Sequence, residues 1–160
     1  MNESTLHTPG DSATPTDDSI NALLAQLTDP TALVACARAR GAAGDAAGTV
    51  ALCRKALTLS PGNAGALVTL GEACEAGHRW AEALAAYDEA IAAHPDCAEA
   101  YKRRGGVKFR LNDRLGAFDD LKHALTLRPD WADALSGELS LVLLKYSRTF
   151  AACNDKEIEK

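Results

Sequence analysis

The sequence predicts an all-α protein built as an array of helix-turn-helix repeats, and three observations lead to that prediction. Apolar residues recur at helical spacing, and the sequence has no alternating Val, Ile and Thr runs typical of strands. Alanine is abundant while aromatic residues are only 5%, which favours close packing of paired helices over a bulky sandwich core. Three prolines are spaced 34 residues apart: Pro61, Pro95 and Pro129.

The clearest unit covers residues 64–97 and reads as two short amphipathic helices. The first helix carries one apolar stripe: Leu67, Leu70, Gly71 and Cys74. The second carries another: Ala83, Leu84, Tyr87, Ala90 and Ile91. We expect Gly77-His78 to end the first helix and Pro95 to end the second. Neither helix can bury its stripe alone, so the unit requires neighbouring units.

The 34-residue spacing supplies those neighbours and divides the chain into repeats at 30–63, 64–97 and 98–131. The motif that recurs is a large residue at Leu67, then Leu70-Gly71, Cys74, Ala83, Tyr87, Ala90 and Pro95. This motif resembles the tetratricopeptide repeat (TPR) family. The resemblance implies a short right-handed superhelix of helical hairpins. The repeat at 30–63 is degenerate, because Thr49 stands where the other two have alanine.

The segments on either side of the repeats have different characters. Residues 1–18 are polar and acidic, so we expect disorder, and 19–28 are expected to form a short N-terminal helix. Residues 132–152 continue the helical stripe and suit a C-terminal capping helix, followed by a polar tail at 153–160. Leu141, Leu143 and Leu144 make that last helix apolar on more than one face. Two interpretations remain open: deep packing on the third repeat, or a surface for a partner or for self-association into an oligomer.

Two cations stand at positions of the third repeat that are usually apolar in the family, Arg104 and Lys108. We expect their aliphatic stems to lie on apolar surface with the charges in water.

Cysteine usage argues against disulfides and metal binding. The count of five is odd, no secretory signal is visible in residues 1–18, and Cys36, Cys53 and Cys74 fall on core positions. His94 and Cys97 form one isolated near pair, which is not the clustered spacing of a metal site. We find no nucleophile and base pair, phosphate-binding glycine loop or paired-carboxylate motif. The expectation is a protein without catalytic activity, cofactor or metal.

The charge of −5 is unevenly distributed, with a basic third repeat beside an acidic second one. The basic cluster at 102–114 is interrupted by acids and lacks stacking aromatics, which argues against nucleic-acid binding. No apolar run is long enough to span a bilayer, so no membrane insertion is expected and the protein is expected to be cytoplasmic.

In the TPR family the first helix of each repeat lines a concave groove that binds peptides. Carried over to this chain, the resemblance implies a groove lined by Val34, Arg38, Val68, Glu72, Glu75, Lys102, Phe109 and Arg110. The expected ligand is a protein segment of mixed charge, with Phe109 as its main apolar contact. The clamp that holds acidic chaperone C-termini is not expected, since of its five positions only Arg103 matches and Glu99 would repel a carboxylate.

These patterns together predict a scaffold or adaptor that binds a peptide segment of another protein. Two alternatives remain at this stage. A small bacterial secretion chaperone with three repeats has a similar size, acidity and layout. A self-assembling repeat module would use the apolar C-terminal helix.

Overall fold

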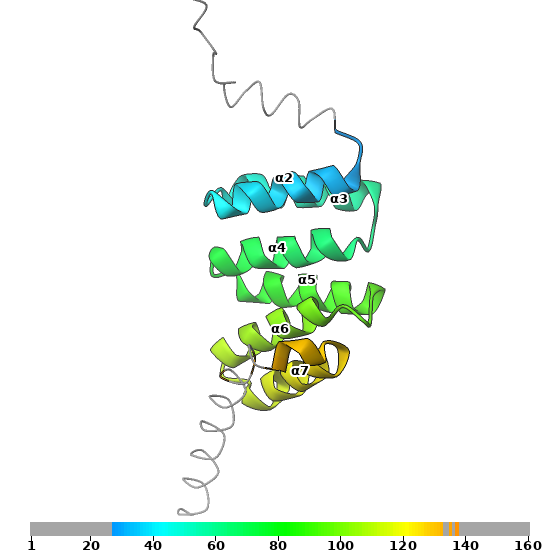
Figure 1. Cartoon of the computed structure of the whole chain (residues 1–160). Helices are drawn as coiled ribbons and strands as arrows, with labels where there is room; N and C mark the ends of the chain where they lie inside the picture. The colour runs from blue at the N-terminus through cyan, green and yellow to red at the C-terminus, as the bar shows by residue number, and fades with distance from the viewer. Residues whose placement is uncertain (1–26, 133–134, 136, 138–160) are drawn as a thin grey trace, which may run out of the picture.

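The structure is a computed structural model that describes residues 27–132, 135 and 137, and in this part of the chain six α-helices form three stacked hairpins (Figure 1). The helices are α2 (Pro30–Ala42), α3 (Ala46–Leu59), α4 (Ala64–Ala76), α5 (Trp80–Ala93), α6 (Ala98–Arg110) and α7 (Arg114–Leu127), with a 3₁₀ turn η1 (Pro129–Trp131) after them. The first helices of the hairpins begin 34 residues apart, at Pro30, Ala64 and Ala98. The predicted all-α repeat architecture is confirmed.

Short polar side chains define where the helices begin. Asp29 accepts hydrogen bonds from the backbone N–H groups of the first turn of α2, and Pro30 occupies the first helical position. Asp45, Asn63 and Asp113 each accept one such bond at the starts of α3, α4 and α7. These bonds satisfy backbone donors that have no partner inside the helix.

The turn inside each hairpin has the same backbone geometry. Gly44, His78 and Asn112 are spaced 34 residues apart, and all three have a positive φ, at 84°, 56° and 68°. Only glycine adopts this conformation without steric cost, and asparagine is one of the side chains that tolerate it best. The repeat therefore extends to the backbone conformation of each turn, although the residue at that position differs.

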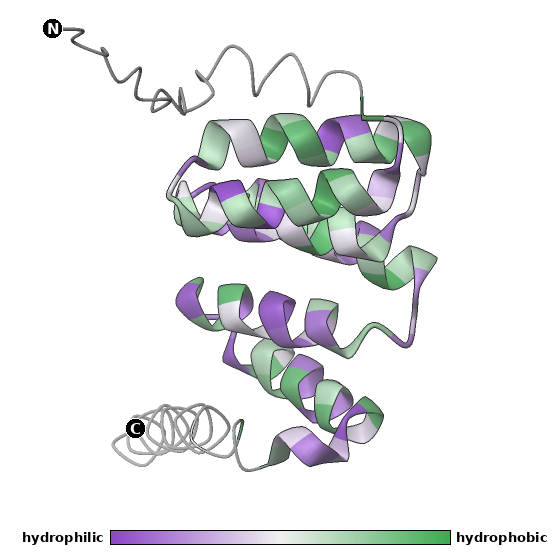
Figure 2. Ribbon diagram, turned by 45° about the horizontal axis from the view of Figure 1, so that its top comes forward, coloured by the Kyte–Doolittle hydropathy of each residue, from purple (hydrophilic) through white to green (hydrophobic). Residues whose placement is uncertain are grey.

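The core is a chain of clusters that bridge successive hairpins. One cluster joins the first hairpin to α4 through Ala66, and the next joins the second hairpin to α6 through Ala100 and Val107. In Figure 2 each helix carries both hydrophobic and hydrophilic residues, as an element with one buried stripe should. We call the contact between the first two hairpins the first junction and the contact between the last two the second junction.

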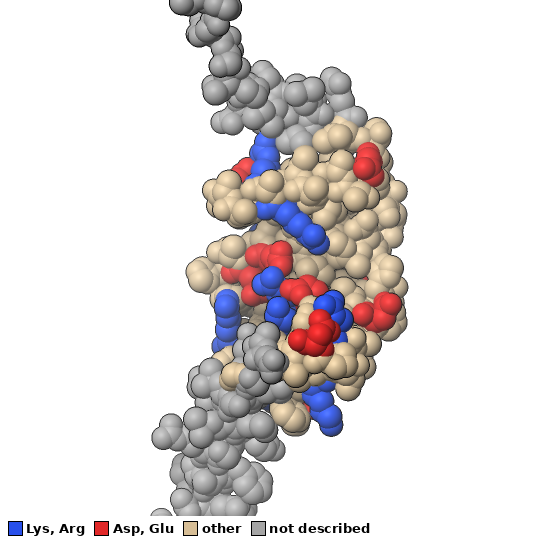
Figure 3. All heavy atoms as spheres, in the orientation of Figure 1, with Lys and Arg blue, Asp and Glu red and all other residues tan. Residues whose placement is uncertain are grey.

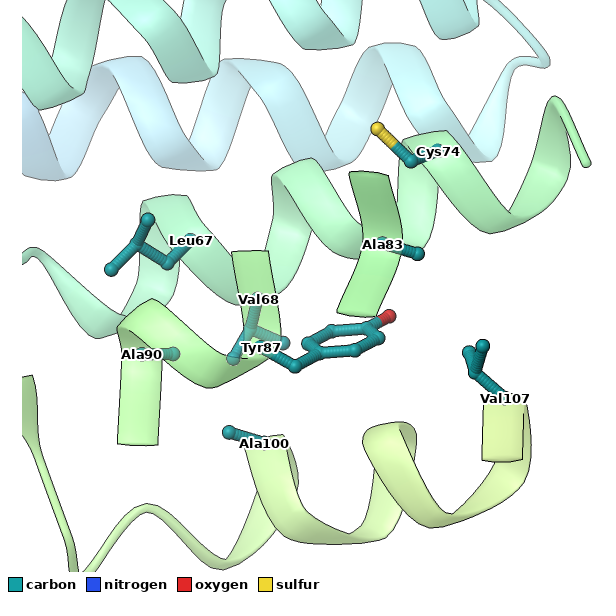
Figure 4. Close-up of a cluster of buried hydrophobic side chains, with 8 residues drawn as sticks. All are labelled: Leu67, Val68, Cys74, Ala83, Tyr87, Ala90, Ala100 and Val107. Atoms are coloured by element: carbon teal, nitrogen blue, oxygen red, sulfur yellow. The ribbon is translucent and has the colours of Figure 1, made fainter. Parts of the chain in front are cut away.

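Tyr87 is the largest fully buried side chain among the described residues, and Gly71 makes room for it. Figure 4 shows the Tyr87 ring between side chains of α4 and Ala100 and Val107 of α6. A Cβ atom on Gly71 would lie 2.5 Å from Cζ and 2.9 Å from Cδ1 of that ring. Gly71 therefore leaves the space that the aromatic ring occupies.

The expectation for Arg104 and Lys108 is wrong. Both cations contact Asp120, whose side chain is only 6% exposed: Arg104 Nε and Nη2 donate to its two oxygens at 2.8 and 2.6 Å, and Lys108 Nζ lies 2.9 Å from Oδ2. A buried carboxylate offers these cations a stronger interaction than water does, so their charges turn inward. The corresponding positions of the second repeat are Leu70, Cys74 and Ala86.

Thr49 replaces the alanine of the other hairpins without leaving a polar atom unsatisfied. Its side chain is 1% exposed, and its hydroxyl oxygen lies 2.7 Å from the carbonyl oxygen of Asp45 and 3.2 Å from that of Ala37. Burying a hydroxyl is tolerated when it is hydrogen-bonded, so the degenerate repeat still folds as a hairpin.

Several predicted segments lie outside the described residues. These are the tails at 1–18 and 153–160, nearly all of the helix expected at 19–28, and most of the capping helix at 132–152, including Leu141, Leu143 and Leu144. Residues 27 and 28, the end of the expected N-terminal helix, are not helical. Across 27–132, 135 and 137, none of the helices combines the length and apolar character that crossing a bilayer requires.

Candidate functional site

The first helices of the hairpins lie side by side, because α2 contacts α4 and α4 contacts α6 (Figure 1). We call their shared face the inner wall. Figure 3 shows acidic side chains gathered at the level of α4, with basic side chains at the levels of α2 and α6. This layered charge follows from the basic, acidic and basic character of the three repeats.

Most of the acidic charge on α4 is compensated by α6. Arg103 lies 2.7 Å from Glu72 across the second junction and 2.8 Å from Glu99 on its own helix. Burial lowers the pKa of the Arg103 guanidinium, but the hydrogen bond to Glu99 and the charge of Glu72 raise it on balance. The arrangement holds Glu72 in place and leaves it little capacity to attract a cationic ligand.

Glu75 is held from two sides. It accepts a hydrogen bond from the Tyr87 hydroxyl, and Arg110 Nη1 lies 3.8 Å from its other oxygen. Burial, followed by the hydrogen bond to Glu75, raises the pKa of Tyr87 well above its ordinary value, so the phenol stays protonated and donates. Glu75 therefore links the inner wall to the core beneath it.

The apolar positions expected on the wall are largely covered by the protein itself. Val34 and Val68 are 7% and 5% exposed and belong to the clusters that bridge the hairpins. Phe109 is partly buried and packs against the cluster of Leu121 and Leu135. Lys102 Nζ lies 5.0 Å from the centroid of the Trp131 ring. The wall thus exposes mainly charged side chains in its second and third repeats.

Arg38 differs from the other cations of the wall. Its side chain is exposed, and its Nε donates to the Thr69 hydroxyl at 3.2 Å across the first junction. Among the described residues no carboxylate lies within ion-pair distance of its guanidinium. The Thr69 contact orients Arg38 while leaving its positive charge uncompensated.

A cavity of about 310 Å³ opens beside Arg38, at the end of the first junction where the hairpin turns lie. Its principal lining residues are Arg38, Ala46, Thr49, Thr69, Glu72 and Ala76. The four remaining lining residues are glycines and alanines. The volume falls within the range of small ligand pockets, roughly 300–1,000 Å³. The cavity brings Arg38 and Glu72, both predicted wall residues, to one place.

Sequence reasoning missed three contributors to this site. Thr69 and Arg103 hold charged wall residues in place, and Thr49 lines the cavity. Comparison of residues 34 positions apart could have indicated the cavity, because some of its lining positions hold small side chains where the next repeat has large ones. The same comparison marks Arg104 and Asp120, because a base and an acid stand where the preceding repeat has Leu70 and Ala86.

The cysteines line no reactive site in the described part of the chain. Cys53 and Cys74 are buried, and Cys36 is only partly so. Burial raises the pKa of the Cys53 thiol to about 11 and also raises that of Cys74, so both remain protonated near neutral pH. Within those residues no three His, Cys, Asp or Glu side chains come together as metal ligands would.

Comparisons with known proteins agree with the repeat fold. Residues 42–103 match the profile of the family described as tetratricopeptide repeat. A TPR repeat-containing protein of Rhizobium etli is 37% identical over 60 residues, which are 38% of this chain and 29% of that relative. The Sgt2 TPR domain of Aspergillus fumigatus has a TM-score of 0.72 at 20% identity, covering 76% of this chain and 82% of that one. The first TPR of Spaghetti (RPAP3), bound to the HSP90 peptide SRMEEVD, has a TM-score of 0.71 at 21% identity, covering 74% and 96%.

Proposed function

We propose, since the hairpins of this chain are tetratricopeptide repeats, that it is a non-catalytic interaction module whose inner wall binds a peptide segment of a partner protein. The observation that carries the proposal is the inner wall itself, a continuous face of three adjacent helices with exposed charged side chains. A structural relative with a similar arrangement of helices is bound to a peptide.

The uncompensated charge on the wall favours acidic groups in the ligand. Arg38 offers an uncompensated cation at one end, whereas Glu72 is already neutralised by Arg103. Because Val34 and Val68 are almost fully buried, specificity on the middle of the wall comes from polar contacts more than from an apolar floor.

The test is selection of peptides from a random displayed library on the full chain, followed by affinity measurement of the selected peptides by isothermal titration calorimetry. The double variant Lys102→Glu and Arg110→Glu reverses two charges on α6. We expect it to weaken binding by roughly tenfold or more.

The matched control is Arg54→Glu with Lys122→Glu, which makes the same charge change at exposed positions of α3 and α7. We expect this control to keep the affinity of the unmodified chain. Failure to select any peptide, or equal loss in the wall variant and the control, would overturn the proposal.

A further inference from the structure

The cavity at the first junction has a filled counterpart at the second junction. Three of its lining residues are Gly44, Ala46 and Ala76. The residues 34 positions further along the chain are His78, Trp80 and Arg110. A histidine, a tryptophan and an arginine in one repeat thus correspond to a glycine and two alanines in the repeat before it.

The three larger side chains pack together at the second junction. The His78 and Trp80 rings meet edge to face with centroids 5.4 Å apart, and the Arg110 guanidinium lies 5.3 Å from the Trp80 ring centroid. Trp80 also packs against the core cluster of the second hairpin. The space at the end of this junction is therefore filled by an aromatic ring held by a cation.

The backbone around both places is equivalent. Ala46 and Trp80 are the first residues of α3 and α5, and Ala76 and Arg110 are the last residues of α4 and α6. Gly44 and His78 both have a positive φ in the intervening turns. The cavity of about 310 Å³ thus lies where small side chains stand on an equivalent backbone, so a group like the one that fills the equivalent place is the expected occupant.

The charge beside the cavity indicates which chemical group of a ligand should lie next to a ring bound in the cavity. Arg38 borders the cavity, its Nε is bound to Thr69, and it has no carboxylate partner among the described residues. Glu72, the acid on the opposite side, is bound to Arg103 at 2.7 Å. The uncompensated charge at the cavity is therefore positive, so a ligand carboxylate is attracted and a ligand cation is not.

We propose that this cavity receives an aromatic side chain of the bound peptide, next to an acidic residue of the same peptide that pairs with Arg38. This inference rests on the proposed function and specifies the ligand at one end of the inner wall. Residues 1–26 of this chain contain no Phe, Tyr or Trp, so that segment does not carry the aromatic group.

The experiment fills the cavity with the side chains that the chain itself uses one repeat later. The variant Ala46→Trp with Ala76→Arg reproduces the Trp80 and Arg110 pair at the first junction. The matched control is Ala47→Trp, which adds the same ring at the adjacent exposed residue of α3. Peptides selected on the unmodified chain are titrated against all three proteins, and indole-3-propionate serves as a small probe in amide-resolved NMR.

We expect the selected peptides to contain an aromatic residue near an acidic one and to lose roughly tenfold or more in affinity for the filled variant but not for the Ala47→Trp control. Indole-3-propionate should shift the amide signals of Gly44 and Thr49, and Arg38→Gln should weaken that effect. Ala46→Trp with Ala76→Arg is expected to remain as thermally stable as the unmodified chain, since the same pair is accommodated at the second junction.

Three results overturn the inference. Peptides that bind the filled variant and the unmodified chain equally would remove the cavity from the site while leaving the proposed function intact. Failure to select any peptide would remove both. A concentration-dependent oligomer that disappears only in the filled variant would show that a second copy of this chain occupies the cavity instead of a partner peptide.

Discussion

Replacing Gly71 by alanine should destabilise the protein, although alanine is the better helix former. Gly71 lies within α4, where the helical propensity of alanine alone would stabilise by about 1 kcal/mol. The added Cβ atom would lie less than 3 Å from three atoms of the Tyr87 ring. Overpacking of a core typically costs about 1–3 kcal/mol.

The position of the ring determines which effect is larger. Tyr87 is 0% exposed, and its hydroxyl is bound to Glu75, so the ring cannot move away without breaking that bond or compressing α6. We therefore take the upper part of the overpacking range and expect a net loss of about 2 kcal/mol in the free energy of unfolding.

The assay is urea denaturation followed by far-UV circular dichroism, with Gly106→Ala as the matched control. Gly106 also lies inside a helix, but a Cβ atom there would meet nothing within 4 Å. Gly106→Ala should therefore stabilise by about 0.5–1 kcal/mol. The same substitution in two helices should thus give opposite signs, and a Gly71→Ala variant as stable as the unmodified chain would refute the packing argument.

Three further predictions concern polar groups in the core. Asp120→Asn should lower the free energy of unfolding by about 2–3 kcal/mol in urea titrations, because Lys108 would lose its carboxylate partner and Arg104 would keep only Asp88. Tyr87→Phe should cost about 1–2 kcal/mol in the same assay, since Glu75 would lose its hydrogen bond. The Cys53 thiol has a pKa raised from 9.0 to about 11, so its contribution to stability is fully present below about pH 9 and is lost as the pH rises toward 11. Over that interval we expect the decline in stability to be smaller by about 2 kcal/mol in Cys53→Ala than in the unmodified chain.

Specific results would contradict each of these. An Asp120→Asn variant of unchanged stability would mean that the charges of Arg104 and Lys108 are hydrated, as the sequence alone suggested. A neutral Tyr87→Phe change would mean that Glu75 is sufficiently held by Arg110. Parallel pH profiles for Cys53→Ala and the unmodified chain between pH 9 and pH 11 would assign the alkaline decline to other groups.

The fold could be predicted because each repeat contacts mainly its neighbours. The 34-residue spacing and the stop signals at Gly77-His78 and Pro95 were sufficient to indicate hairpins, since in such an array local pattern and overall architecture agree. The sequence places Gly71 in the recurring motif, but the Tyr87 ring that occupies the space beside it is identified only in three dimensions.

The site was less predictable, because charged side chains form ion pairs with residues of other helices, and the sequence spacing does not specify these pairs. The spacing does not indicate whether Arg104 points to water or to Asp120, nor that Arg103 joins Glu72 to Glu99. Burial of Val34 also depends on how closely α2 and α4 approach, and spacing leaves that distance undetermined. The sequence does contain one indication of the cavity, because Ala46 is small. That indication becomes clear only when the structure shows Trp80 filling the equivalent place.

The ion pairs of the second junction make the packing of the third hairpin against the second dependent on ionic strength. Arg104 Nη1 lies 2.6 Å from Asp88 on α5, and Arg103 bridges to Glu72 on α4, with both contacts reaching solvent. Mobile ions screen such partly exposed pairs, whereas the apolar contacts around Ala66 are unaffected by screening. Concentrated salt should thus loosen the packing of the C-terminal hairpin before that of the N-terminal one. The curvature of the inner wall, against which a ligand must fit, would then change as well.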